Sequence, residues 1–101
     1  MRKDKFSSCL DFIPGQLVRS KAGHDKGKVF VVVRIEGDRL QLADGRHRLC
    51  ASPKEKNVRH VQKICVFAAE LTGCSQEEAL TDPNIKTAIK TYLSKFENQE
   101  E

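Results

Sequence analysis

The chain has 101 residues, the size of one small domain, which leaves little interior for a buried catalytic cavity, so we expect a binding protein and not an enzyme. The formal net charge of +4 hides an asymmetry, because residues 1–63 hold fifteen Lys and Arg against seven Asp and Glu, whereas the remainder holds three against seven. The basic part favours a polyanionic partner, either nucleic acid or an anionic membrane surface.

Residues 1–13 are polar and basic with scattered apolar side chains, and we expect them to form an N-terminal tail. From Val29 to Ile35 the apolar residues follow a period of two, with both faces apolar at the start, which predicts a deeply buried strand. Gly37 between two acidic residues then predicts a tight hairpin, and residues 39–43 predict the next strand.

Asp44-Gly45 is a second hairpin signal, after which residues 46–50 are expected to run back as a strand. Residues 52–57 predict a loop, and residues 58–63 predict one further strand. Five short strands joined mainly by tight turns predict a β-barrel of SH3-like kind over residues 14–63.

The last third of the chain changes period, and we expect an α-helical extension over residues 64–97 followed by an acidic tail at 98–101. The apolar stretch 64–71 is too short for periodicity to decide between strand and helix, although Gly73 would suit the end of a helix.

Ser75 and Glu78 have the spacing of a capping box and predict a short helical turn. Asp82 before Pro83 predicts the N-terminus of a longer amphipathic helix, with Asp82 as the capping residue. The apolar stripe of that helix comprises Ile85, Ile89, Tyr92 and Phe96. The stripe predicts packing against the barrel, and docking to a partner is the alternative.

The most informative segment is GQLVRSKAGHDKGKVFVV, residues 15–32. Gly23 and Gly27 bracket a loop whose backbone can adopt conformations closed to other residues, and Lys26 and Lys28 flank the second glycine. The segment resembles the KOW motif of small bacterial RNA-binding proteins, which are similar to a KOW-containing large-subunit ribosomal protein of archaea and eukaryotes. The likeness extends from Gly15 to about residue 62.

The resemblance implies an SH3-like barrel whose basic loop face contacts structured RNA, ribosomal RNA or a ribosomal assembly intermediate in particular. His24 stands where such proteins carry Arg, and its ring can stack on a base or donate a hydrogen bond. The implied RNA-binding residues are Lys21, Gly23, His24, Lys26, Gly27, Lys28, Arg46, Arg48, Lys54, Lys56 and Arg59. Such contacts predict recognition of RNA shape and a strong dependence on salt.

A protein-interaction module of the transcription or translation machinery is the alternative function, with the acidic helical third as its contact surface. The three histidines have no nucleophile or carboxylate at a catalytic spacing, which argues against acid–base chemistry. Asp25 and Asp44 are interpreted as turn formers. The sequence leaves the oligomeric state open.

Four cysteines, Cys9, Cys50, Cys65 and Cys74, form no CxxC pair, so we expect reduced structural thiols and no cofactor. A metal site assembled from Cys50, Cys65 and His60 stays open, since ligands distant in sequence can meet in space. No apolar run approaches the roughly 20 residues that span a bilayer, and no secretion signal precedes the domain, so we expect a cytoplasmic protein without a membrane partner.

Overall fold

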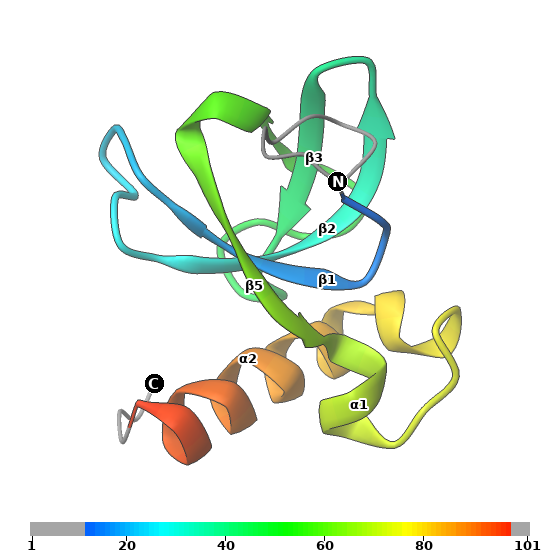
Figure 1. Cartoon of the computed structure of the whole chain (residues 1–101). Coiled ribbons are helices and arrows are strands. Elements are labelled where there is room, and N and C mark those ends of the chain that lie inside the picture. The colour runs from blue at the N-terminus through cyan, green and yellow to red at the C-terminus, as the bar shows by residue number, and fades with distance from the viewer. Residues whose placement is uncertain (1–11, 98–101) are drawn as a thin grey trace, which may run out of the picture.

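The computed structural model describes residues 12–97, in which five strands precede two helices (Figure 1). The strands are β1 (Gln16–Ser20), β2 (Val29–Glu36), β3 (Arg39–Ala43), β4 (Lys54–Asn57) and β5 (Val61–Phe67). The helical elements are the 3-10 turn η2 (Val58–His60), α1 (Ala68–Thr72), the 3-10 turn η3 (Glu78–Leu80) and α2 (Asp82–Phe96).

The strands form one antiparallel sheet in the order β4-β3-β2-β1-β5. Part of the predicted architecture is therefore confirmed, namely a small antiparallel sheet with a C-terminal helix. The sheet is not closed into a barrel, because no ladder within residues 12–97 joins β4 to β5. After only four residues of β4 the chain enters η2, where the Val58 amide donates to the Asp38 carbonyl at 3.0 Å, and β5 then pairs with β1.

Both faces of the sheet carry a hydrophobic core, as the two-sided apolar pattern of β2 predicts. The core between the sheet and the helical elements contains Leu17, Val29, Val31, Ala43, Ala68, Ala79, Ile85, Ala88, Ile89 and Leu93. The opposite core contains Phe12, Val18, Phe30, Val32, Leu40, Leu42, Val58 and Val61. Each fully buried Val, Leu, Ile or Phe side chain contributes about 1.5–3 kcal/mol, so β1 and β2, which supply both cores, hold the domain together.

The connection between β3 and β4 differs from the predicted hairpin. Residues 46–50 form no strand, because the Asp44 carboxylate accepts hydrogen bonds from the amides of Arg46, His47 and Arg48 at 2.9, 2.9 and 2.8 Å. These local bonds replace the ladder bonds that a strand would need. The strand that does pair with β3 is Lys54–Asn57, within the segment predicted as a loop.

The end of the sheet also departs from the prediction. Residues 58–60 form η2, and the strand then continues through Phe67, across the predicted boundary between residues 63 and 64. The ambiguous stretch is thus divided between β5 and α1. Gly73 ends α1 in the left-handed conformation with φ 75°, as predicted.

The amphipathic helix is confirmed over Asp82–Phe96. Its N-cap is Thr81, and Asp82 does not cap the helix but accepts a hydrogen bond from the amide of Cys50 at 2.7 Å. Ile85 and Ile89 pack against the sheet as predicted, whereas the side chain of Phe96 is 56% exposed. Among residues 12–97, no helix combines the length and apolar character needed to cross a bilayer.

The predicted tails fall largely outside the described residues, which exclude 1–11 and 98–101. Phe12, assigned to the N-terminal tail, belongs to the opposite core and is only 2% exposed. The Nζ of Lys63 lies 5.4 Å from the centre of the Phe12 ring, which is a cation–π contact. The folded unit therefore includes Phe12.

The contact between the β3–β4 loop and α2 depends on Gly45. Its φ is 79°, and a Cβ there would overlap the Asp82 carbonyl and lie 2.9 Å from the Lys86 amide nitrogen. Gly45→Ala should lower the free energy of unfolding by about 2–5 kcal/mol, from backbone strain and overpacking together, in urea unfolding followed by circular dichroism. Gly37→Ala is the control, since φ is 64° there with nothing within 4 Å, and strain alone costs about 1–2 kcal/mol. Equal losses would contradict the tight contact.

Candidate nucleic-acid interface

Backbone hydrogen bonds join the two ends of the loop between β1 and β2. The Ser20 amide donates to the Lys28 carbonyl at 2.9 Å, and the Gly27 amide donates to the Ser20 carbonyl at 2.8 Å. Gly23 and Gly27 have φ values of 86° and 91°, which other residues rarely adopt. The sequence interpretation of a glycine-bracketed loop is therefore correct.

A buried carboxylate organises this loop from within. Asp25 Oδ1 accepts hydrogen bonds from the Ser20 hydroxyl at 2.7 Å and from Lys56 Nζ at 2.9 Å, and its Oδ2 lies 3.4 Å from Lys54 Nζ. Lys56 also donates to the Ala22 carbonyl at 2.8 Å. Burial raises the pKa of Asp25, but the hydrogen bonds from Lys56, Ser20 and Lys54 outweigh it and lower the pKa to about 2.

This network changes the role of two predicted RNA-binding residues. The side chain of Lys56 is only 10% exposed, and its ammonium group binds Ser20, Ala22 and Asp25. Lys56 is therefore a structural cation that ties β4 to the β1–β2 loop. Lys54 is 30% exposed and shares its charge with the same carboxylate.

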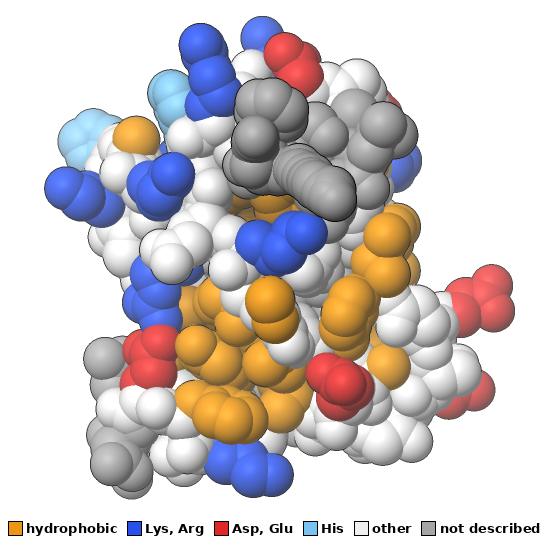
Figure 2. Space-filling model, viewed as in Figure 1, with side chains coloured by type: hydrophobic (Ala, Val, Ile, Leu, Met, Phe, Trp, Pro, Cys, Tyr) orange, Lys and Arg blue, Asp and Glu red, His pale blue; other side chains and the backbone are white. Residues whose placement is uncertain are grey.

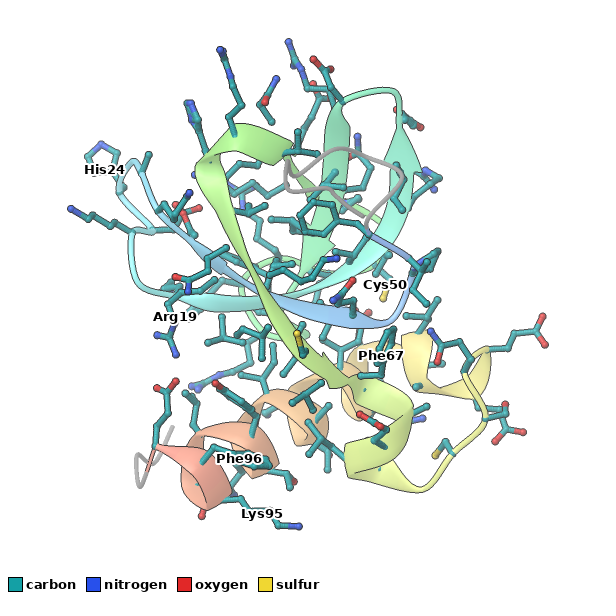
Figure 3. All side chains as sticks on the ribbon, in the orientation of Figure 1. Arg19, His24, Cys50, Phe67, Lys95 and Phe96 are labelled. Atoms are coloured by element: carbon teal, nitrogen blue, oxygen red, sulfur yellow. The ribbon has the colours of Figure 1, made fainter. Side chains whose placement is uncertain are left out.

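The other predicted cations remain on the surface. Figure 2 shows Lys, Arg and His side chains gathered over the β1–β2 loop and the turn that precedes β5, and Figure 3 shows His24 projecting from the tip of that loop. The exposed cationic residues of the predicted set are Lys21, His24, Lys26, Lys28, Arg46, Arg48 and Arg59. The amide of Lys21 donates to the His60 carbonyl at 2.8 Å, which places η2, and with it Arg59, beside the loop.

Two adjoining hollows lie where the β1–β2 and β3–β4 loops meet. The smaller has a volume of about 220 Å³ and is lined by His24, Asp25, Lys28, Phe30, Asp44, His47, Arg48 and Lys54. The larger, which we call the cleft, has a volume of about 390 Å³. It is lined by Gly27, Lys28, Val29, Asp44, Arg46, His47, Lys86, Ile89, Lys90 and Leu93.

The hollows thus bring together six residues of the predicted set from two loops and β4. These are His24, Gly27, Lys28, Arg46, Arg48 and Lys54. Lys21, Gly23, Lys26, Lys56 and Arg59 do not line them. Asp44 contributes one negative charge, and although burial raises its pKa, three backbone amides outweigh that effect and lower it.

Sequence reasoning missed three cationic or titratable side chains of the cleft, namely His47, Lys86 and Lys90. The two lysines are four residues apart, so they share one face of α2. That spacing was a usable signal, but the net negative charge of the C-terminal third concealed it.

Arg19 was also missed, although it connects the loop to α2. Its Nη1 donates to the Gly27 carbonyl at 2.7 Å, and its Nη2 forms an ion pair with Glu97 just after the helix. Figure 3 shows Arg19 projecting from the sheet toward the C-terminal end of α2. Its signal was weak, because Arg19 lies within a strand pattern and its partner Glu97 is 78 positions away in the chain.

Cys50 has a structural role at the start of α2. Its amide donates to Asp82, and its thiol donates to the Leu80 carbonyl at 3.3 Å. Burial and the nearby Asp82 carboxylate raise the pKa of Cys50 to about 11, so the thiol stays protonated. Within the described part of the chain, no group of three or more His, Cys, Asp or Glu residues has metal-binding geometry, and the hypothetical Cys50, Cys65 and His60 site does not assemble.

No model of a known protein family matches the chain, and no curated protein matches it.

The Asp25 network predicts a specific sensitivity to acid. Because the pKa of Asp25 is lower in the folded chain than in an unfolded one, its carboxylate stabilises the fold above about pH 4, and this contribution is lost as the pH falls toward about 2. Urea unfolding across this range should show about 1–2 kcal/mol of stability lost through Asp25.

Asp25→Asn should be less stable than the wild type at pH 7, with the difference between the two shrinking below pH 4. Asp44 titrates in the same direction in both proteins, so the difference isolates Asp25. Asp38→Asn is the matched control, because that side chain is 71% exposed and should leave the curve unchanged. A constant difference between wild type and Asp25→Asn from pH 7 to pH 2 would contradict the assignment.

Proposed function

We propose that the protein is an RNA-binding module that holds the backbone of structured RNA on its β1–β2 and β3–β4 loops. The observation that carries this proposal is the convergence of exposed cations from both loops on the adjoining hollows, with His24, Lys28 and Arg48 around the smaller one. Each phosphate that such a surface neutralises releases condensed counterions, which is the main source of affinity for a polyanion.

The chemistry of the surface favours recognition of shape over sequence. Lysine ammonium groups act as point charges on phosphates and carry no base information. The one aromatic residue other than histidine along the two hollows, within residues 12–97, is Phe30, and it is only 2% exposed. Phe, Tyr and Trp platforms of the kind that read single-stranded sequence are therefore missing from this face among the described residues, and the exposed rings there are those of His24 and His47.

The sheet and its glycine-hinged loop are consistent with the KOW resemblance. We propose that the antiparallel sheet is an SH3-like variant that stays open between β4 and β5, with η2 as the turn between them. On this interpretation the natural ligand is ribosomal RNA or an assembly intermediate of the ribosome, and binding requires no catalysis.

A protein-interaction module is the second candidate, and one observation favours it. Figure 2 shows hydrophobic side chains gathered over the end of β5 and the adjoining helices, where Phe96 is 56% exposed and stacks on Tyr92 with ring centres 5.3 Å apart. A partner bound to this apolar face would bind with little dependence on salt.

Lys26→Ala combined with Lys28→Ala should weaken binding of a fluorescent hairpin RNA and lower the slope of log affinity against log salt by about 2. The melting temperature should stay within about 3 °C, because both side chains are exposed.

The matched control is Arg34→Ala combined with Lys95→Ala, which removes two exposed charges that line neither hollow. It should retain the wild-type affinity to within about twofold. RNA binding by the loop variant with the same affinity and salt slope as the wild type would refute the proposed function.

A further inference from the structure

Contacts at both ends of the cleft fix the two loops to α2. At one end Gly45 packs against the first turn of α2, beside the amide of Lys86. At the other end Arg19 binds the Gly27 carbonyl and Glu97, and so joins the β1–β2 loop to the end of the same helix. In Figure 1 the loop projects beyond the ends of β1 and β2, above the C-terminal part of α2. The cleft is therefore preorganised by contacts at both of its ends.

The lining of the cleft is divided between an apolar floor and cationic walls. Val29, Ile89 and Leu93 form the floor, and they are 6%, 5% and 5% exposed. The walls carry exposed lysines from two elements, Lys28 from the loop and the Lys86–Lys90 pair from the helix.

These wall lysines keep their charge available for a ligand. No carboxylate within residues 12–97 forms an ion pair with Lys28, Lys86 or Lys90. Among the described residues that line the cleft, the one acid is Asp44, whose Oδ1 already accepts three backbone hydrogen bonds. The cleft therefore presents a positive potential around an apolar base.

His47 adds a planar ring at the junction of the cleft and the smaller hollow. It lines both and is exposed. Histidine rings stack on unpaired bases, so this side chain can hold the face of a base while its neighbours hold a phosphate.

A paired RNA strand cannot contact the apolar floor of the cleft with its bases, because the bases are stacked inside the duplex. Its exposed surface consists mainly of sugars and phosphates. An unpaired nucleotide offers an apolar base face and a phosphate together, which matches a cleft with an apolar floor and cationic walls. The volume of about 390 Å³ falls at the small end of the range of ligand pockets, about 300–1,000 Å³.

From this match we infer that the cleft takes one unpaired nucleotide, such as a bulged base, from the RNA that the surrounding loops hold by its backbone. Lys86 and Lys90 bind its phosphate together with Lys28, and His47 stacks on its base. This inference rests on the proposed function, and it assigns α2 a role in RNA selection that the KOW-like segment alone does not supply.

The test compares two fluorescent hairpin RNAs that differ by a single bulged nucleotide. Wild-type protein should bind the bulged hairpin about tenfold more tightly than the fully paired one, and Lys86→Ala combined with Lys90→Ala should abolish that preference while retaining most of the affinity for the paired hairpin. The control is again Arg34→Ala with Lys95→Ala. Lys95 is on the same helix and does not line the cleft, and Figure 3 shows it pointing away from the sheet.

His47→Ala isolates the contact with the base. It should weaken binding of the bulged hairpin about fivefold or more, the effect expected for one lost stacking contact, and leave the paired hairpin unchanged.

The outcomes separate this inference from the proposed function. If the helix variant keeps the wild-type preference, or loses affinity equally for both hairpins, the unpaired-nucleotide site is refuted while RNA binding by the loops stands. If wild-type protein binds neither hairpin in a salt-dependent manner, the proposed function itself fails. Loss of the preference in both the helix variant and His47→Ala would establish the site.

Discussion

The ion pair between Asp25 and Lys56 is the interaction on which the binding surface depends. It joins the loop between the first two strands to the far edge of the sheet, since β1 and β4 are not neighbours in the strand order. Removing two charges from water costs several kcal/mol per ion, which such a pair recovers only when further hydrogen bonds satisfy both groups. Here the Ser20 hydroxyl donates to Asp25 Oδ1 and the Ala22 carbonyl accepts from Lys56, whereas Asp25 Oδ2 has no hydrogen-bond partner within residues 12–97 and lies 3.4 Å from Lys54 Nζ.

One consequence is that the basic residues fall into two groups, those that stabilise the loop and those that are exposed on its surface. Lys56 and, in part, Lys54 neutralise the carboxylate that shapes the loop, and Arg19 fastens the loop to the helix. The remaining exposed cations of the loop therefore project from a backbone whose own buried charge, that of Asp25, is already neutralised by Lys56 and Lys54. The loop backbone therefore loses little further entropy when a ligand binds, although the exposed lysine side chains still lose rotamer freedom.

The two-sided sheet explains how such a small chain can offer both a stable core and a cleft. The helix-side core places α2 across the sheet, and the same packing brings Lys86 and Lys90 to the β3–β4 loop. The C-terminal third is acidic overall, but Lys86 and Lys90 lie on the face of α2 that adjoins the loops. No residue of β5 lines the cleft, nor does the exposed Phe96.

Sequence patterns predicted the elements whose signals are local. The alternation in Val29–Ile35, the strand after Gly37 and the helical stripe of α2 all reflect burial that repeats at the period of the element itself. β4 was missed because Lys54–Asn57 carries no apolar pattern, and its pairing with β3 is set by a distant partner. The prediction of a return strand after Gly45 was wrong, because the Asp44 carboxylate accepts hydrogen bonds from three successive backbone amides there.

The candidate site shows the same limit. The glycine-bracketed loop could be recognised from its residues, but the burial of Lys56 could not, because its partner Asp25 is 31 positions away in the chain. Likewise, His47 becomes a neighbour of Lys28 only when the sheet forms, and Lys86 and Lys90 do so only when α2 docks on the sheet. Residue type indicates charge, whereas only the tertiary packing decides which charges face a ligand.

The most direct test of the central claim is a map of the contact surface by nuclear magnetic resonance. A ¹⁵N-labelled sample would be titrated with a hairpin RNA carrying one bulged nucleotide while the backbone amide signals are followed. The account predicts that the largest shifts occur in residues 23–28, 45–48 and 86–93. Shifts concentrated in residues 64–72 instead, with the two loops unmoved, would contradict it.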